Sequence, residues 1–194
     1  MNLSTDCELV RLNENVDLTS FSCGISDLDE FLLEDSNNYS SQLLGVTYLF
    51  VSPSTQAIIA FFTVSNASLN LKDLPNTKKK KVDGEIPHNK RRKSYPSVLL
   101  GRLGVASKFQ KLGIGEQVLD FLKYWFRYEN KTGCRFIIVD AYNNTKVLNF
   151  YEKNDFKYIQ TPEDETKQLI KEKNKEDVEL LTRHMYYDLA RFEG

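Results

Sequence analysis

Six consecutive residues of this chain could bind an anion through their backbone: Gln110-Lys111-Leu112-Gly113-Ile114-Gly115. They lie between an apolar run, 98–105, that favours a strand and an amphipathic pattern, 116–128, that favours a helix. Glycine has no Cβ and lets the backbone approach a ligand closely, and the first amides of a helix have no intrahelical partner. The turn therefore predicts a bound phosphate or pyrophosphate.

The elements around this turn predict one α/β domain over residues 1–194. A strand, the glycine turn, a helix and a further strand imply a parallel strand pair joined by a crossover, within a mostly antiparallel mixed sheet. Ser26 is expected to cap the first helix. Apolar patterns predict strands at 7–12, 46–51, 57–64, 98–105, 134–141, 156–159 and 178–190, and helices at 26–38, 116–128 and 147–151, while 163–177 reads as a helix or a loose loop.

Charge is unevenly distributed along the chain. The net charge is −1, yet residues 71–93 carry nine cations and three acidic residues, a local charge of +6, so the remainder carries −7. This stretch belongs to a polar segment, 68–96, that is long for a connection and that we interpret as a basic loop insertion. It could contact RNA phosphates, although a solvated loop explains the same charges.

Several classes of protein and site are disfavoured by composition. No apolar run approaches eighteen residues and the first residues lack the pattern of a signal peptide, so we expect a cytoplasmic protein without a membrane span. Three cysteines without CxxC spacing predict neither disulfides nor a zinc site. Only two histidines are present, His88 in an expected loop and His184 in an expected strand, so we expect no metal site and give histidine catalysis little weight.

Two common phosphate-binding motifs do not fit the turn. A Rossmann turn would need a third glycine where Val118 stands, and a Walker motif would need Lys-Ser or Lys-Thr where Glu116-Gln117 follows Gly115. The turn resembles instead the Gln/Arg-x-x-Gly-x-Gly/Ala sequence of the GNAT N-acetyltransferases.

A second stretch resembles the same family. Asn144-x-x-Val147-x-x-x-Tyr151-x-x-x-Asp155-Phe156 is similar to the family's Asn-x-x-Ala-x-x-x-Tyr-x-x-x-Gly-Phe signature. Val147 replaces a small alanine, and Asp155 replaces a glycine at a turn where positive φ is common, which Asp tolerates better than most residues. Neither departure touches the phosphate turn.

Further stretches resemble the toxin-type GNAT subgroup, whose members acetylate the amino acid on charged tRNA. They are Phe21-Ser22-Cys23-Gly24, Leu28-Asp29-Glu30-Phe31-Leu32, Leu100-Gly101-Arg102-Leu103-Gly104-Val105 and Val139-Asp140-Ala141. All matched stretches together cover 21–156 with gaps. The basic segment is longer and richer in lysine than this subgroup leads us to expect.

The resemblance implies acetyl-CoA as the cofactor, lying between the strand that ends near Val105 and the strand that contains Val139. It implies that amides from Lys111 to Glu116 hold the pyrophosphate and that an amide near Val105 polarises the thioester carbonyl. The residues implied to bind the cofactor are Leu103, Gly104, Val105, Gln110, Lys111, Leu112, Gly113, Ile114, Gly115, Glu116, Asn144 and Tyr151.

The resemblance also implies a catalytic role for Tyr151, as the donor of a proton to the departing CoA thiolate. A phenol, with a pKa of about 10, remains protonated at neutral pH. On residue type alone, this tyrosine would more often be a packing residue of an amphipathic helix. Asn144 likewise either caps that helix or also contacts the cofactor.

The acceptor must be an unprotonated amine. An α-amine, with a pKa of about 7.7–8.0, is partly neutral at physiological pH, whereas a lysine side chain needs strong help from a base. No base stands out, which favours an α-amino acceptor such as that of aminoacyl-tRNA, and leaves Glu8, Asp140 or a water chain as ways to accept the proton. Arg102, Arg135 and Arg183 would extend an RNA-binding face only if the fold gathers them.

Several functions remain open on these grounds. An amine of a small molecule or a protein is the nearest alternative acceptor, and a non-catalytic module that binds acyl-CoA or RNA is another. A toxin role would imply an antitoxin partner, and the family resemblance makes a homodimer a further expectation.

Overall fold

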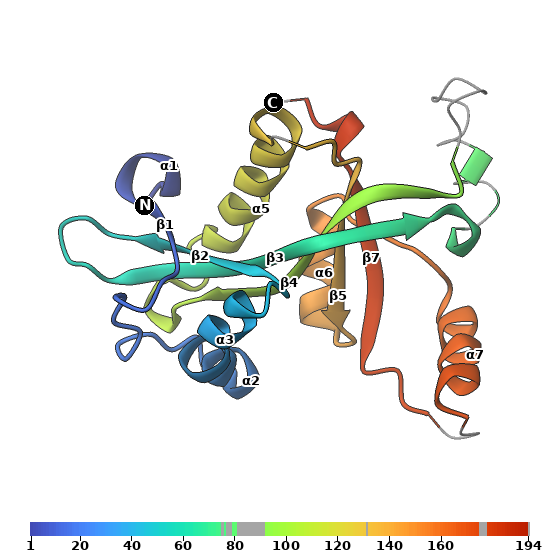
Figure 1. The fold of residues 1–194 in the computed structure, drawn as a ribbon, viewed down its shortest axis with the longest axis horizontal. Coiled ribbons are helices and arrows are strands. Elements are labelled where there is room, and N and C mark those ends of the chain that lie inside the picture. The colour runs from blue at the N-terminus through green and yellow to red at the C-terminus, as the bar shows by residue number, and fades with distance from the viewer. Residues whose placement is uncertain (75, 77–78, 81–91, 131, 175–177, 194) are drawn as a thin grey trace. The chain divides into compact units, whose positions relative to one another are not determined.

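The computed structural model describes residues 1–194 except 75, 77–78, 81–91, 131, 175–177 and 194. Its chain forms two compact units, one of Met1–Asn66 with Leu99–Glu129 and the other of Ala67–Val98 with Asn130–Gly194 (Figure 1). The expectation of one domain over 1–194, with a basic insertion at 68–96, remains a prediction. Among the described residues, no helix is long and apolar enough to cross a membrane.

In the described residues, seven strands form a mixed sheet in the order β1-β2-β3-β4-β5-β7-β6, with β4 and β5 parallel as predicted. Strands β3 and β4 run through both units, and their antiparallel pairing is marked by hydrogen bonds from Ala106 to Ile59 and from Leu71 to Lys93. The strands are β1 Glu8–Arg11, β2 Val46–Val51, β3 Ile58–Asn70, β4 Ser94–Val105, β5 Phe136–Tyr142, β6 Lys157–Tyr158 and β7 Thr182–Asp188.

Helices flank this sheet in both units. The α-helices are α1 Leu3–Asp6, α2 Ser26–Glu30, α3 Ser36–Ser41, α5 Ile114–Tyr124, α6 Thr145–Lys153 and α7 Pro162–Lys173. Turns of π-helix at Phe31–Asp35 and Trp125–Glu129 continue α2 and α5, and 3-10 turns lie at Leu71–Asp73, Ser107–Phe109 and Leu189–Arg191.

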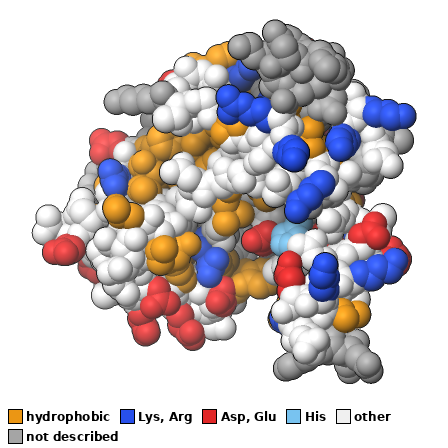
Figure 2. Space-filling model, turned by 45° about the vertical axis from the view of Figure 1, so that its right-hand side comes forward, with side chains coloured by type: hydrophobic (Ala, Val, Ile, Leu, Met, Phe, Trp, Pro, Cys, Tyr) orange, Lys and Arg blue, Asp and Glu red, His pale blue; other side chains and the backbone are white. Residues whose placement is uncertain are grey.

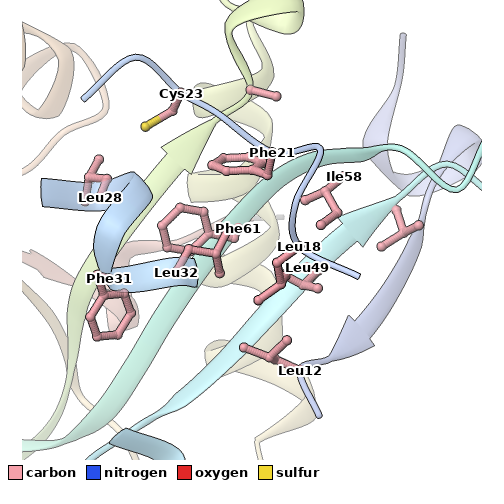
Figure 3. Packing of buried hydrophobic residues seen from close by; sticks show 12 residues of the cluster. Leu12, Leu18, Phe21, Cys23, Leu28, Phe31, Leu32, Leu49, Ile58 and Phe61 are labelled. Carbon is pink, nitrogen blue, oxygen red and sulfur yellow. The ribbon is translucent and has the colours of Figure 1, made fainter. Parts of the chain in front are cut away.

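The first unit buries apolar side chains on both faces of its strands, because successive residues of a strand point to opposite faces. On one face, Leu49 and Phe61 pack beneath the segments 12–23 and 28–32 (Figure 3). On the other face, Phe50 and Phe62 contact Phe121 of α5, and Tyr48 contacts Trp125. Both faces of the strand pair β2 and β3 are therefore covered.

The second unit is built around the antiparallel pair β5 and β7. Helix α6 packs on one face, where Tyr151 contacts Phe156 and Phe156 contacts Tyr187. Phe136 contacts Tyr95 and Tyr186 on the other face. The predicted strands near 134–141 and 156–159 and the helix near 147–151 are confirmed, with shifts at their ends.

Three boundaries differ from those expected. The side chain of Ser26 does not cap α2: Ile25 occupies the capping position, with no side-chain capping hydrogen bond. At the ends of the polar segment 68–96, β3 continues to Asn70 and β4 begins at Ser94. The last strand begins at Thr182 rather than 178, since only from there does it pair with β5.

Candidate functional site

The predicted anion turn leads directly into α5. Strand β4 ends at Val105, a 3-10 turn follows at Ser107–Phe109, and Lys111 and Gly113 both adopt left-handed conformations, with φ of 63° and 74°. The first helical hydrogen bond runs from the amide of Gln117 to the carbonyl of Gly113 (3.1 Å). The backbone amides just before Gln117 therefore have no partner within the helix. In the described chain, no side chain caps this helix.

The turn has room for a ligand. A Cβ built on Gly113 would meet no atom within 4 Å, and Lys111, Leu112 and Gly113 are exposed. Open space, unpaired helix amides and two left-handed residues are the features that a pyrophosphate needs. The residues present therefore fit the phosphate portion of a nucleotide cofactor.

Side-chain hydrogen bonds fix the base of this turn. The amide Nε2 of Gln110 donates to the carbonyls of Cys23 (2.7 Å) and Val105 (3.0 Å), and Ser107 donates through both its amide and its hydroxyl to the carbonyl of Ser22. Gln110, predicted to bind the cofactor, thus joins the end of β4 to the segment 22–24. The segment 22–24 resembles a family pattern in sequence, and in the structure its carbonyls accept hydrogen bonds from the residues of the turn.

Asp29 holds the segment 22–24 in place. Its carboxylate accepts hydrogen bonds from the Ser22 hydroxyl and the Cys23 amide, both at 2.7 Å, and from the Gly24 amide at 3.3 Å. Desolvation opposes ionisation of Asp29, but these hydrogen bonds together lower its pKa. Burial raises the pKa of the neighbouring Cys23 thiol to about 11, so this cysteine is a packing residue.

Gly104 and Val105 are held at the end of β4 by packing. A Cβ on Gly104 would lie 2.4 Å from Cε1 of the Phe61 ring, so glycine is required there for close packing. Val105 is half-buried, and its carbonyl is occupied by Gln110. Leu103 is also half-buried on the same strand.

Helix α6 of the second unit carries Asn144 and Tyr151. The side chain of Asn144 caps the helix by accepting a hydrogen bond from the Val147 amide at 3.0 Å, as predicted. Tyr151 is 8% exposed, and burial, followed by the negative charge of Asp140, raises its pKa. Asp155 has a φ of 67°, so the aspartate does occupy the left-handed turn that the sequence predicts at this position.

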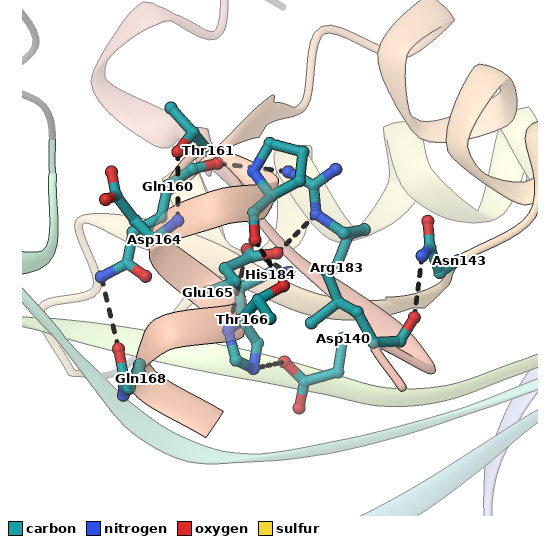
Figure 4. Close-up of polar contacts among 12 residues, drawn as sticks. Asp140, Asn143, Gln160, Thr161, Asp164, Glu165, Thr166, Gln168, Arg183 and His184 are labelled. Atoms are coloured by element: carbon teal, nitrogen blue, oxygen red, sulfur yellow. Dashed lines mark hydrogen bonds and ion pairs between the residues drawn. The ribbon is translucent and has the colours of Figure 1, made fainter. Parts of the chain in front are cut away.

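A polar cluster that sequence reasoning largely missed lies on β5, β7 and α7 of the second unit (Figure 4). His184 Nε2 lies 3.3 Å from Asp140 Oδ1, and Arg183 forms an ion pair with the buried carboxylate of Glu165. The sequence offers Asp140 only as one of several possible bases, and it gives His184 little weight as a catalyst. No local sequence pattern predicts this cluster, because Glu165 of α7 contacts residues of β7 that lie well beyond it in the sequence.

Each of the three arginines that could extend an RNA face has a partner within its own unit. Arg135 and Arg183 lie beside opposite ends of the β5–β7 pair and bind Asp188 and Glu165, respectively. Arg102, in the first unit, lies over the ring of Phe31 at 4.9 Å. Lys78, Lys81, Lys90 and Arg91 of the basic segment lie outside the described residues, and so does His88.

Comparisons with known proteins agree with this geometry. Residues 80–158 match the model of the acetyltransferase (GNAT) domain. A tRNA-acetylating toxin of Mycobacterium tuberculosis is 26% identical over 152 residues, which cover 78% of this chain and 84% of that protein.

Solved structures show the same fold. A Tyr-to-Phe mutant of KacT superposes with a TM-score of 0.71 at 21% identity, covering 96% of each chain. AtaT complexed with acetyl-methionyl-tRNAfMet gives a TM-score of 0.71 at 19% identity, covering 95% of this chain and 96% of that one. AtaTR bound with acetyl-CoA gives 0.68 at 20% identity, covering 95% of each chain.

The anion turn before α5, the Asn144–Tyr151 helix and the mixed sheet are thus found together with a matching domain model and matching structures. Residues 80–158 thus match the GNAT acetyltransferase domain, and the chain is similar to a tRNA-acetylating toxin and shares the fold of the KacT and AtaT structures.

Proposed function

We propose that this protein transfers the acetyl group of acetyl-CoA to the α-amine of an aminoacyl-tRNA. The observation that carries the proposal is the open, glycine-bearing turn at the start of α5, which suits the pyrophosphate of this cofactor. The tRNA acceptor is supported by the similarity to a tRNA-acetylating toxin over most of both chains. An α-amine also needs less help from a base than a lysine side chain.

The cofactor would supply an acetyl group activated as a thioester. Amides from Lys111 to Glu116 would hold its pyrophosphate, and the amide of Val105 would polarise the carbonyl of the acetyl group. Leu103 and Gly104 would lie along the pantetheine on β4. Asn144 would contact the cofactor in addition to capping α6. Gln110 would act through the hydrogen bonds that hold the turn in place.

Tyr151 would donate its phenolic proton to the thiolate that leaves. Burial and the charge of Asp140 raise its pKa, so the phenol carries its proton across the physiological range and is available as the donor. Its buried position excludes bulk water from the donor.

The wider biological role is proposed on the same basis. AtaT has been solved bound to the C-terminus of the antitoxin AtaR, and we propose a corresponding antitoxin partner for this chain. A cytoplasmic location, where charged tRNA is found, and a homodimer remain predictions of the same kind.

The test is transfer of label from acetyl-CoA to a panel of charged tRNA, deacylated tRNA, polyamines, aminoglycosides and peptides. Label on charged tRNA alone is the expected result. Label on a small amine or a peptide would leave the acetyltransferase standing and replace the acceptor. Binding of CoA without transfer to any amine would favour a non-catalytic acyl-CoA module.

A further inference from the structure

Asp140 and His184 face each other across two neighbouring strands. They are directly opposite in the register of β5 and β7, so their side chains lie on the same face of the sheet. Oδ1 of Asp140 lies 3.3 Å from Nε2 of His184, and the two side chains are 47% and 52% exposed. A molecule from solvent can therefore reach this pair. Figure 2 shows the described histidine, in pale blue, at the surface beside acidic side chains.

His184 is held in place from its other side. Oε1 of Glu165 accepts a hydrogen bond from the backbone amide of His184 at 3.1 Å and lies 3.9 Å from its Nδ1. The other oxygen of Glu165 binds Arg183, whose guanidinium lies over the ring of Tyr158. Charged groups therefore reach His184 from β5 (Asp140) and α7 (Glu165), with Arg183 of β7 balancing the second carboxylate.

Asp140 is also linked to the proposed proton donor. Its negative charge is the neighbouring charge that raises the pKa of Tyr151, in addition to burial. An exposed carboxylate, a histidine and a buried phenol within electrostatic range of that carboxylate thus occur in one unit of the chain.

We propose that Asp140 binds the ammonium form of the acceptor amine and that His184 accepts its first proton. This inference rests on the proposed function, because it needs an amine acceptor and Tyr151 as the acid. Asp140 and His184 would then be catalytic residues, and Glu165 a positioning residue that orients the imidazole.

The protons balance in this scheme. The ammonium gives one proton to the imidazole of His184, which releases it to solvent. The nitrogen lone pair forms the bond to the acetyl carbon as the carbon–sulfur bond breaks, and Tyr151 gives its proton to the sulfur. The nitrogen loses its second proton to solvent and Tyr151 regains one from solvent, so that acetylated amine, CoA thiol and one free proton are the products.

Three variants test the proposal: Asp140→Asn, His184→Gln and the control Asp164→Asn, which neutralises an exposed carboxylate on α7. We expect kcat/KM for the amine that the native protein acetylates to fall about 100-fold at pH 6.5 in the first two. The deficit should shrink above pH 8, where an α-amine with a pKa of about 7.7–8.0 is already neutral. The control should keep the native pH profile.

A purely structural pair would give a deficit that is constant with pH. That result, or native rates in both variants, would overturn the proposal. Failure of the proposed function is distinguishable, because a native protein that acetylates a small amine instead of charged tRNA still permits the same pH comparison with that amine.

Binding gives a readout that needs no catalysis. The probes are methionyl-adenosine with a stable amide linkage and the same compound with hydrogen in place of the α-amine, titrated into the native full-length protein at pH 6.5. The proposal predicts about tenfold tighter binding of the amine and loss of this preference in Asp140→Asn. Equal binding of the two probes by the native protein would contradict it.

Discussion

The two units of this chain carry chemistry in different ways. In the first, the turn before α5 offers backbone amides, and its side chains, such as Gln110, serve to hold the backbone in place. In the second, side chains supply the functional groups of the proposal: Tyr151 on α6, Asp140 on β5 and His184 on β7. The function of the turn should therefore be lost when its backbone conformation changes, whereas the function of the second unit should be lost when a single functional group is removed.

The largest effect is expected at Tyr151. Tyr151→Phe should lower kcat by about 10²–10⁴-fold, because the leaving thiolate loses its proton donor, while CoA affinity remains unchanged. Steady-state kinetics and calorimetric titration with CoA measure the two quantities. Tyr187→Phe is the matched control, since Tyr187 is also buried and packs on the same Phe156.

The pH dependence of Tyr151 sharpens the same test. Because burial and Asp140 raise its pKa, its deprotonation should not limit the rate at any pH below 10. A loss of activity between pH 8 and 10 that disappears in Tyr151→Phe would contradict this account.

The backbone of the first unit was more predictable from sequence than the side-chain cluster of the second. Gly113 is a local signal, since a glycine between a strand and a helix indicates a left-handed turn. The positive φ of Asp155 could be predicted in the same way, because a short motif places a turn at this residue. Glu165, in contrast, meets Arg183 and His184 eighteen and nineteen residues later in the chain, and no spacing rule for a helix or a strand predicts that contact.

A large effect on stability is expected at Glu165. Glu165→Leu should destabilise the fold by about 3–5 kcal/mol, because it leaves the buried guanidinium of Arg183 without a counter-charge. The double variant Glu165→Leu/Arg183→Met should be less destabilised, since no unpaired charge remains. Denaturant unfolding measures both, and a double variant less stable than the single one would refute this explanation.

A smaller and more local effect is expected in the first unit at Gly113. Gly113→Ala places a Cβ on a residue with a φ of 74°, which costs about 1–2 kcal/mol, and should weaken CoA binding by bringing that Cβ toward the phosphates. Gly133→Ala is the matched control, because Gly133 also has open space around it but no positive φ. Equal CoA affinity in the two variants would place the phosphates elsewhere.

The smallest effect is expected at Asp155. Asp155→Gly relieves a positive φ at an exposed position and should stabilise the protein by at most about 1 kcal/mol, while Asp155→Ala should destabilise it. Thermal unfolding distinguishes the two signs. Activity should be unchanged in Asp155→Gly, since the residue serves the backbone of the turn after α6.

The central claim, acetylation of the α-amine on a charged tRNA, is tested most directly by identifying the acetylated atom. Methionyl-tRNA is incubated with the protein and labelled acetyl-CoA, the ester bond is hydrolysed under mild alkali, and the released amino acid is analysed by mass spectrometry. The account predicts labelled N-acetyl-methionine with the native protein and only a trace with Tyr151→Phe. Unmodified methionine from the native protein, in a preparation that acetylates another amine of the panel, would contradict it.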